Sequence, residues 1–375
     1  MAQDSNSFPP LNTVFRNKIV RNLRPIAIHW IKRAKLVRKA DINGLILNAE
    51  QGIIGHFQQI EFAMKFIRGL HNLTQHQQGC VLTIGNFDGV HRGHQALLRH
   101  LRQAGSHRHL PVVVMVFEPQ PLELFQPEAA PARLTRLREK LEHLEKFGVD
   151  EVVCINFDQD FAKLTAENFI SELLVKRLNV KLLAIGDDFR FGAGRRGDFL
   201  LLQQAATQYG FDVVSTETYI EQGKRISSTA VRQALANSDF SQAEILLGRP
   251  WSITGRVVHG DALGRTLGFP TANIPLKRRV TPVKGVFAVE VYGVDEHPLA
   301  GVANIGTRPT IKGIRQQLEV HLLDTQRDLY GKRIQVVIKH KIRDEQRFAS
   351  LDALTQQIAQ DVETARNYFV QRTTV

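Results

Sequence analysis

Residues 83–98 read TIGNFDGVHRGHQALL and overlap the end of the apolar run Cys80–Ile84. The apolar run has the length and composition of a buried strand, and the residues from Gln95 onward have the spacing of a helix. Between them lie glycines, an acid and the two histidines His91 and His94. The sequence therefore predicts a strand, a tight turn and a helix whose first turn carries two imidazoles.

This turn is compatible with metal binding, phosphate binding or simple helix capping. A helix N-terminus has unpaired N–H groups and a partial positive charge, so it binds phosphate readily. Gly89 and Gly93 allow close backbone approach, and His91 and His94 can lie on one side of the first turn. His-x-x-His also suits a metal, but no third ligand can be picked out and HExxH is absent. Phosphate binding is the favoured interpretation.

Apolar runs and helical periods alternate from Cys80 onward. The expected strands are Cys80–Ile84, Val112–Phe117, Glu151–Ile155, Lys181–Ile185 and Asp212–Ser215. The expected helices are Gln95–Gln103, Leu134–Phe147, Ala166–Leu178, Phe199–Gln208 and Thr229–Ala236. This alternation predicts a Rossmann-like α/β domain with a doubly wound parallel sheet. Such sheets bind ligands beyond the carboxyl ends of their strands, which is where the histidine-bearing turn lies.

The pattern changes near Gly248, where β-like segments punctuated by Gly and Pro begin. These segments are Trp251–His259, Val286–Tyr292, Leu299–Asn304, Gln317–Leu323 and Ile334–Lys341. They predict a small antiparallel β-barrel. Ser350 is expected to cap a last helix, whose buried face is expected to carry Leu351, Leu354, Ile358, Val362 and Phe369. The expected domains are residues 1–63, 64–247 and 248–375.

The charge of the chain is strongly basic and unevenly placed. The 375 residues carry a net charge of +12, which favours an anionic partner such as nucleic acid, a membrane surface or a phosphorylated small molecule. Residues 1–63 hold nine Lys/Arg against four acids, so they supply nearly half of the excess. We expect this basic extension to be poorly ordered, or to precede the true start at Met64. A basic anchoring arm is the alternative.

The cysteine count and hydropathy indicate the compartment. The two cysteines, Cys80 and Cys154, make neither a disulfide framework nor a metal-spaced pair, which fits a reducing cytosol. No apolar run reaches the ~18 residues of a membrane span. No secretory signal precedes the body of the chain. The prediction is a cytoplasmic protein with no membrane partner.

Two further stretches follow predicted structure in a way that suits nucleotide binding. IGDDFRFGAG, residues 185–194, follows a strand, so Asp188 or Arg190 can contact a nucleotide there. ISSTAVR, residues 226–232, places Ser228 and Thr229 at a helix start and Arg232 one turn on, which suits a triphosphate. GAGRRG does not follow a strand directly, and no Walker A sequence exists. Any ATP chemistry is therefore not of the P-loop type.

Together, TIGNFDGVHRGH, GDDFRFG and RISSTAVR resemble the nucleotidyltransferase half of prokaryotic bifunctional riboflavin kinase/FAD synthetases. The resemblance runs from about Met64 to the final helix. It implies that ATP is bound in the first domain by Gly85, Phe87, Asp88, Gly93, Asp188, Arg190, Ser228 and Thr229. It implies catalytic roles for His91, His94 and Arg232. Many relatives have histidine where Gln120 stands, so no role is carried onto Gln120.

GFPTAN, residues 268–273, supplies the second motif. By itself it predicts a tight turn, but within the resemblance Gly268, Phe269, Pro270, Thr271 and Asn273 match the Mg–ATP motif of the flavokinase domain. The resemblance implies that Thr271 and Asn273 are the metal ligands there.

In QQLEVHLLD, residues 316–324, alternation places Glu319 and His321 on the face opposite Leu318. Glu319 matches the family's catalytic glutamate, which accepts the proton of the attacking hydroxyl. Asn304 and Arg308 are candidates for shaping the flavin or phosphate site.

The resemblance implies two ATP-dependent steps, riboflavin to FMN and then FMN to FAD plus pyrophosphate. The implied cofactor is Mg²⁺, and FMN and FAD are products rather than prosthetic groups. We expect no nucleic-acid partner and a monomer or weak homo-oligomer. Two alternatives remain at this point. Another nucleotidyltransferase is opposed by the appended GFPTAN domain. A nucleic-acid-binding protein is suggested by the charge, but no RNA-binding aromatic motif or zinc finger is present.

Overall fold

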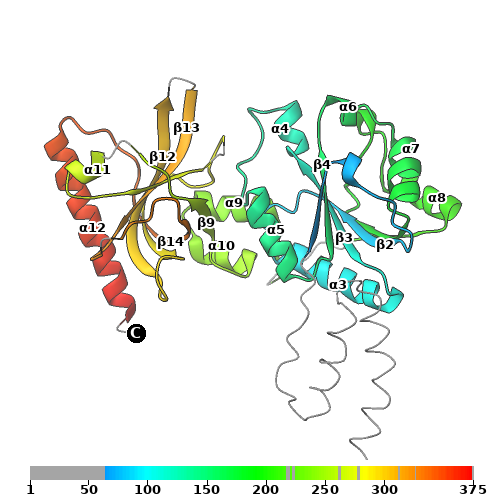
Figure 1. The fold of residues 1–375 in the computed structure, drawn as a ribbon, viewed down its shortest axis with the longest axis horizontal. Coiled ribbons are helices and arrows are strands. Elements are labelled where there is room, and N and C mark those ends of the chain that lie inside the picture. Colours follow the sequence, from blue (N-terminus) through cyan, green and yellow to red (C-terminus); the bar gives the residue numbers. More distant parts are fainter. Residues whose placement is uncertain are drawn as a thin grey trace, which may run out of the picture. The chain divides into compact units, whose positions relative to one another are not determined.

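The computed structural model describes residues 64–216, 220–221, 224–260, 263–276, 279–310, 313–325 and 327–373 (Figure 1). These belong to the second of two compact units, Met1–Phe62 and Ala63–Val375. The predictions made for residues 1–63 lie outside the described residues. Every helix in the described ranges is too short or too polar to span a bilayer.

A six-stranded sheet forms the core of the first domain (Figure 1). Its strands are β1 (Lys65–Arg68), β2 (Cys80–Ile84), β3 (Val112–Glu118), β4 (Glu151–Asn156), β5 (Val180–Ile185) and β6 (Asp212–Ser215). The order is β1-β4-β3-β2-β5-β6 and every neighbouring pair is parallel. The strand order reverses at β2, so the carboxyl end of β2 is a topological switch point. The predicted strands are confirmed, and β1 is an addition whose residues are mostly exposed.

Helices cover both faces of this sheet. The helical segments of the first domain are α3 (Arg92–Arg108), α4 (Pro121–Phe125), α5 (Leu137–Lys146), α6 (Gln159–Ala162), α7 (Ala166–Asn168), the π-helix η2 (Phe169–Arg177), α8 (Phe199–Tyr209), α9 (Ser228–Ala236) and α10 (Phe240–Leu247), with short 3-10 turns η1 (Leu70–Asn72) and η3 (Ala193–Arg195). Leu82 of β2 packs in one cluster with Leu173 of η2 and Leu202 of α8. Its neighbour Val81 packs with Leu101 of α3. Alternate residues of β2 therefore face opposite helical layers, which confirms the doubly wound architecture.

The helix expected to start at Leu134 begins three residues later, so that boundary was wrong. The backbone N–H groups of Leu134 and Thr135 donate to the carboxylate of Asp88, and Arg136 is the N-cap residue. Because these N–H groups serve a residue 46 positions earlier, Leu134 and Thr135 stay outside the helix.

The second domain is a nearly closed antiparallel barrel, as predicted (Figure 1). Its strands are β9 (Ser252–Arg256), β10 (Ala272–Pro275), β11 (Gly285–Tyr292), β12 (Leu299–Thr310), β13 (Gly313–Leu322) and β14 (Arg333–Arg343), with the short helix α11 (Leu263–Thr266). Their order is β10-β13-β12-β11-β14-β9. A bridge between Val258 and Asn273 brings the chain after β9 against β10. The prediction of a turn at GFPTAN missed β10, because the motif continues directly into a strand. A separate hairpin pairs β7 (Ile220–Glu221) with β8 (Lys224–Arg225).

The last helix, α12 (Leu351–Thr373), packs on the barrel. The hydroxyl of Ser350 accepts the N–H of Ala353, which confirms the predicted cap. Val362 and Ala365 are buried against Val286 and Val302 of the barrel. Leu351 was expected on this face, but its side chain is 58% exposed. The first turn lies ahead of the buried residues of α12, and no residue in the described part of the chain covers Leu351.

One hydrophobic cluster joins the two domains. It contains Val231 and Leu235 of α9, Leu246 of α10, and interior barrel residues such as Phe287 and Ile305. Phe240 of α10 also makes an edge-to-face contact with Phe287 at 5.9 Å. The helices that close the first domain therefore share a core with the barrel.

Candidate active sites in the two domains

A cap hydrogen bond and ring stacking fix the two histidines of the loop between β2 and α3. His91 is the N-cap of α3, and its Nδ1 accepts the N–H of His94 at 3.4 Å. The two rings stack with centroids 3.7 Å apart, and Phe87 lies 4.7 Å from the His94 ring. Gly89 has φ = 82°, and a Cβ there would lie 2.8 Å from a methyl of Leu134, so only glycine fits. The loop is therefore fixed by packing as well as by the cap.

Both imidazoles are neutral at pH 7. Burial lowers the pKa of His91 to about 4. Burial, with the neighbouring His91 and Lys140, holds the pKa of His94 well below its usual value. Since Nδ1 of neutral His91 accepts a hydrogen bond, its proton lies on Nε2. His91 can therefore donate one hydrogen bond to an oxyanion without carrying a charge.

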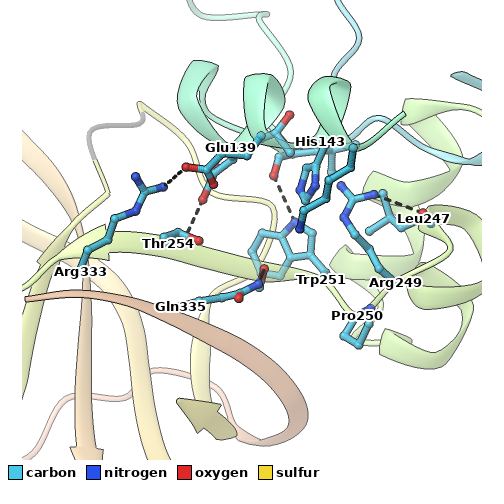
Figure 2. Close-up of a pocket in the computed structure, with 14 residues that line it drawn as sticks. Glu139, His143, Leu247, Arg249, Pro250, Trp251, Thr254, Arg333 and Gln335 are labelled. Atoms are coloured by element: carbon cyan, nitrogen blue, oxygen red, sulfur yellow. Dashed lines mark hydrogen bonds and ion pairs between the residues drawn. The ribbon is translucent and has the colours of Figure 1, made fainter. Parts of the chain in front are cut away.

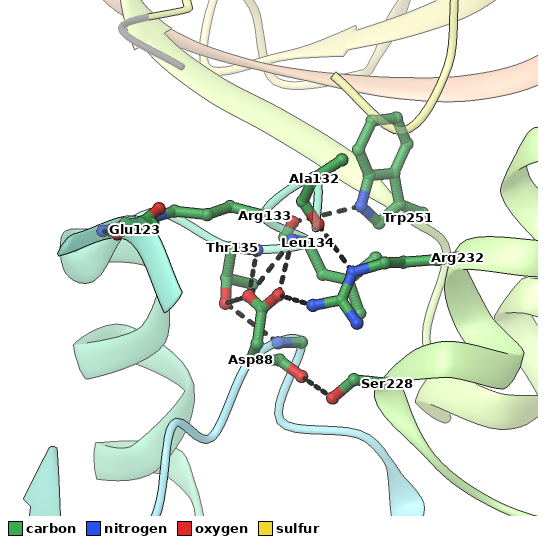
Figure 3. A network of polar contacts seen from close by, with 10 residues as sticks. Asp88, Glu123, Ala132, Arg133, Leu134, Thr135, Ser228, Arg232 and Trp251 are labelled. Carbon is green, nitrogen blue, oxygen red and sulfur yellow. Dashed lines mark hydrogen bonds and ion pairs between the residues drawn. The ribbon is translucent and has the colours of Figure 1, made fainter. Parts of the chain in front are cut away.

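Asp88 joins three parts of the chain (Figure 3). Its carboxylate is almost completely buried and accepts five hydrogen bonds, from the N–H groups of Leu134 and Thr135, the Thr135 hydroxyl and Arg232. Its backbone carbonyl accepts the hydroxyl of Ser228 at 2.9 Å. Asp88 thus holds the β2–α3 loop, the residues before α5 and the start of α9 together.

Helix α9 meets the β2–α3 loop through its first turns. The N-cap is Ser227, whose hydroxyl accepts the N–H of Ala230, and Ser228 is the first helical residue. Arg232 donates from Nε to Ala132 at 2.7 Å and from Nη2 to Asp88 at 2.6 Å. Thr229 is exposed. The sequence stretches around His91 and Ser228, expected to be neighbours, are neighbours in the structure.

Two cavities flank β10 and β13 in the barrel. One, of about 630 Å³, is lined by Arg265, Pro270, Asp328 and Tyr330 among others. The second, of about 510 Å³, is lined by Phe269, Phe348, Leu354 and Ile358 and by several polar groups. Thr271 and His321 line both cavities. The wall between the cavities is therefore the place where two ligands can meet.

Three predicted residues lie in one row across neighbouring strands. Glu319 of β13 is in register with Asn273 of β10 on one side and Asn304 of β12 on the other. Gln317 donates from Nε2 to Oε1 of Glu319 at 3.2 Å and also to Oδ1 of Asn273. The Oδ1 atom of Asn304 is buried and accepts no hydrogen bond from any described residue. The row presents carboxylate and amide oxygens to the second cavity.

Family comparisons match both domains. Residues 73–230 match the FAD synthetase family and residues 247–369 match the riboflavin kinase family. A bifunctional riboflavin kinase/FMN adenylyltransferase from Escherichia coli (strain K12) is 70% identical over 307 residues, covering 82% of this chain and 98% of the relative. The chain belongs to the bifunctional riboflavin kinase/FMN adenylyltransferase family. Its two activities are riboflavin kinase and FMN adenylyltransferase, also called FAD synthetase.

Another curated relative and one solved structure are also similar to this chain. The bifunctional riboflavin kinase/FMN adenylyltransferase of Haemophilus influenzae is 54% identical over 306 residues, 82% of this chain and 99% of the relative. A crystal structure described as a macrolide-efflux protein from Streptococcus pneumoniae has a TM-score of 0.65 and 31% identity, covering 81% of this chain and 99% of that chain. The fold of that protein is therefore similar to the fold of this chain.

Some predicted residues of this bifunctional enzyme lie apart from the Asp88 network. Asp188 and Arg190 are exposed in the loop after β5, and Arg190 donates to Asp187 and Phe189 within that loop. Their role in nucleotide binding stays a prediction. Arg308 pairs with Arg315 between β12 and β13, and its side chain lies outside the described residues.

Sequence reasoning placed His321 on the same face as Glu319 without giving it a role, and it missed Gln317. Both residues stand two positions from Glu319, so the period of two in QQLEVHLLD was a usable signal for Gln317 as well. His321 donates from Nδ1 to the carbonyl of Pro270 at 2.9 Å, which orients it between the cavities. In contrast, Leu134 contacts Asp88 through its own backbone N–H, and Arg249 donates to the backbone carbonyls of Gly89 and Val90. Any residue has these backbone groups, so the sequence gives no sign of such contacts.

Proposed function

We propose that Glu319 is the base of the riboflavin kinase step. The observation that carries this proposal is the row of Asn273, Glu319 and Asn304 in the second cavity, close in sequence to Thr271 and His321, which line both cavities. The cavity lined by Phe269, Phe348 and aliphatic residues suits the flavin ring. The cavity beyond Thr271 takes ATP, bound by the segment Gly268–Asn273. Glu319 accepts the proton of the 5′-hydroxyl as this oxygen attacks the γ-phosphorus.

Thr271 and Asn273 fit a Mg²⁺ site of the kind that is shared with substrate phosphates. Their neutral oxygens are hard donors, and Mg²⁺ takes one or two protein ligands while keeping phosphate oxygens and water. No cluster of three His, Cys, Asp or Glu suited to a metal occurs among the described residues, which agrees with such a sparse ligand set. Bound Mg²⁺ neutralises phosphate charge. Asn304 and Arg308 are proposed to contact the flavin or its phosphate.

The second step is proposed for the carboxyl end of β2. The FMN phosphate, which is already ionised, attacks the α-phosphorus of ATP, so no general base is needed. His91, His94 and Arg232 stabilise charge on the phosphates, and Gly85, Phe87, Gly93, Ser228 and Thr229 position the nucleotide. Asp88 has two proposed roles. It holds together the loops that form this site, and it contacts the nucleotide directly, as the resemblance implies.

The experiment compares Glu319→Gln and His94→Ala in the full chain, assayed separately for riboflavin phosphorylation and FMN adenylylation. Glu319→Gln keeps the shape of the side chain and removes the base, so it is expected to abolish the first activity and spare the second. His94→Ala is expected to do the reverse. Loss of both activities in either folded variant contradicts the assignment of two separate sites.

The remaining proposals concern the setting of the enzyme. We propose a cytoplasmic monomer or weak homo-oligomer that binds riboflavin, FMN and ATP and no nucleic acid, with domains at 64–247 and 248–375. The absence of an RNA-binding motif and the family's small anionic substrates support this. Sedimentation at several protein concentrations, with and without added RNA, tests the oligomeric state and the nucleic-acid prediction together.

A further inference from the structure

Arg249 lies in the segment between α10 and the barrel, far along the chain from the histidine loop. It donates from Nη2 to the carbonyl of Gly89 at 2.6 Å and from Nη1 to the carbonyl of Val90 at 3.2 Å. Nη1 also donates to Leu247 at 3.2 Å (Figure 2). The guanidinium thus binds the two peptide groups directly before His91.

We propose that Arg249 is a positioning residue for FMN adenylylation. Carbonyl and following N–H point in opposite directions in a trans peptide. We call residues 248–251, which connect α10 to β9, the linker. Because Arg249 holds the Val90 carbonyl toward the linker, the N–H of His91 points away from the linker. The same contact fixes the position of His91, which caps α3. Val90 is held a second time, since Gln95 donates to its carbonyl at 2.8 Å and to that of Leu247 at 2.8 Å.

The linker holds the other wall of the same site through Trp251. The indole N–H donates to the carbonyl of Leu134 at 3.2 Å, and the N–H of Leu134 donates to Asp88. Arg249 and Trp251 line one cavity of about 310 Å³ together with Leu134 and Thr135 (Figure 2). Two residues of the linker therefore contact both loops that meet at Asp88.

Arginine suits this position for a physical reason. Its planar fork reaches several carbonyls at once, whereas a lysine ammonium acts as a single point donor. All hydrogen bonds of Arg249 to described residues go to backbone carbonyls. Burial lowers the pKa of Arg249 to about 10, with Glu139 opposing this shift, so the group stays charged at pH 7. Its charge in turn contributes to the low pKa of His91.

Arg249 lies outside the segment that matches the FAD synthetase family. The match to FAD synthetase ends at residue 230, and Arg249 falls inside the match to riboflavin kinase, residues 247–369. A residue from the kinase segment therefore supports the adenylylation site. This inference rests on the proposed place of ATP at the β2–α3 loop, which the His94→Ala assay tests independently.

The test uses Arg249→Ala and Arg249→Lys in the full chain, with Arg256→Ala as the matched control. Arg256, like Arg249, donates to a backbone carbonyl, but its acceptor is Gly331 within the kinase segment. We expect FMN adenylylation to fall about 10- to 100-fold in Arg249→Ala and at least about tenfold in Arg249→Lys, because charge without the fork does not fix the loop. Riboflavin phosphorylation, and both activities of Arg256→Ala, should stay within about twofold of the unsubstituted protein.

A pH profile separates positioning from general destabilisation. Removing the positive charge raises the pKa of His91, so the acid limb of adenylylation should move to higher pH in Arg249→Ala and stay in place in Arg249→Lys. Three results overturn the proposal: an unchanged adenylylation rate, full activity in Arg249→Lys, or an equal fall of both activities. If Arg249→Ala does not fold, the test rests on Arg249→Lys, in which adenylylation must fall relative to riboflavin phosphorylation. An intact adenylylation activity in His94→Ala would instead overturn the underlying site.

Discussion

His91 and His94 stack face to face, with ring centroids 3.7 Å apart, and the first accepts the backbone N–H of the second. Such a pair cannot carry two charges at this separation when it is buried. In the adenylylation site proposed here, the charge that stabilises ATP phosphates is therefore expected to come from Arg232, from N–H dipoles and from bound cations rather than from imidazolium groups.

Adenylylation should show no histidine titration near neutral pH. An ordinary histidine titrates near 6.5, but burial lowers the pKa of His91 to about 4. The rate of FAD formation is thus expected to stay level as the pH falls from about 8 to 6, where an unperturbed histidine would gain its proton. A pH series of FAD formation under saturating substrates measures this. A midpoint near 6.5 on the acid side would contradict neutral, buried imidazoles.

The same burial predicts how stability depends on pH. The folded state binds the His91 proton more weakly than the unfolded chain, so stability is full above pH ~6.5 and falls as the pH drops toward ~4. Each unit of pKa difference corresponds to about 1.4 kcal/mol. Urea unfolding at several pH values measures the slope. His91→Gln, which does not titrate, should lose part of it.

Asp88→Asn should destabilise the first domain severely. The amide would place an N–H₂ group where Asp88 now accepts five hydrogen bonds, and it would leave Arg232 without its buried partner. The expected loss is about 3–5 kcal/mol in the free energy of unfolding. The control is Asp212→Asn, which removes an exposed ion pair with Arg108 and should cost less than about 1 kcal/mol. Equal losses in the two variants would refute the network role of Asp88.

Lys140→Met should stabilise the protein, in contrast to Asp88→Asn. The Lys140 side chain is completely buried, and its Nζ has no hydrogen-bond partner among the described residues. Burial also lowers its pKa. A methionine of similar length removes the unpaired ammonium, and stability should rise by about 1–3 kcal/mol. Denaturant unfolding measures the change. A decrease in stability would mean that the ammonium has a partner other than the described residues.

Trp251 should report ATP binding at the first site. The chain has two tryptophans, Trp30 and Trp251, so Trp30→Phe leaves Trp251 as a single emitter. Its indole binds Leu134, which binds Asp88, so a ligand at the β2–α3 loop changes its surroundings. We expect a fluorescence change on adding ATP that persists with Glu319→Gln and is lost with His94→Ala. A fluorescence change that persists in His94→Ala would place the reported nucleotide in the barrel.

The sequence predicted most of the regular structure because local signals determine it. The run Cys80–Ile84 matches β2 residue for residue, since Gly79 and Gly85 bound a continuous apolar stretch. Strand β1 was missed because three of its four residues are exposed and it is ordered by pairing with β4, more than 80 residues away. Ser228 and Thr229 were expected at a helix start, and α9 begins at Ser228 with Ser227 as its cap.

The candidate site residues divide in the same way. Asn273, Glu319 and Asn304 lay in recognisable motifs, and strand register brings them together. Arg249 gave no comparable signal, because its acceptors are carbonyls that any residue supplies. Its role depends on which peptide groups the fold carries to it.

The hydrophobic cluster that α9 and α10 share with the barrel has a consequence for synthesis on the ribosome. The first sheet and most of its helices are complete when residue 216 has emerged, and they can fold at once. Helices α9 and α10 must wait, because their apolar partners Phe287 and Ile305 are translated later. FAD-forming capacity should therefore appear only after the barrel has been made, so a ribosome stalled between the domains carries a chain that cannot yet make FAD.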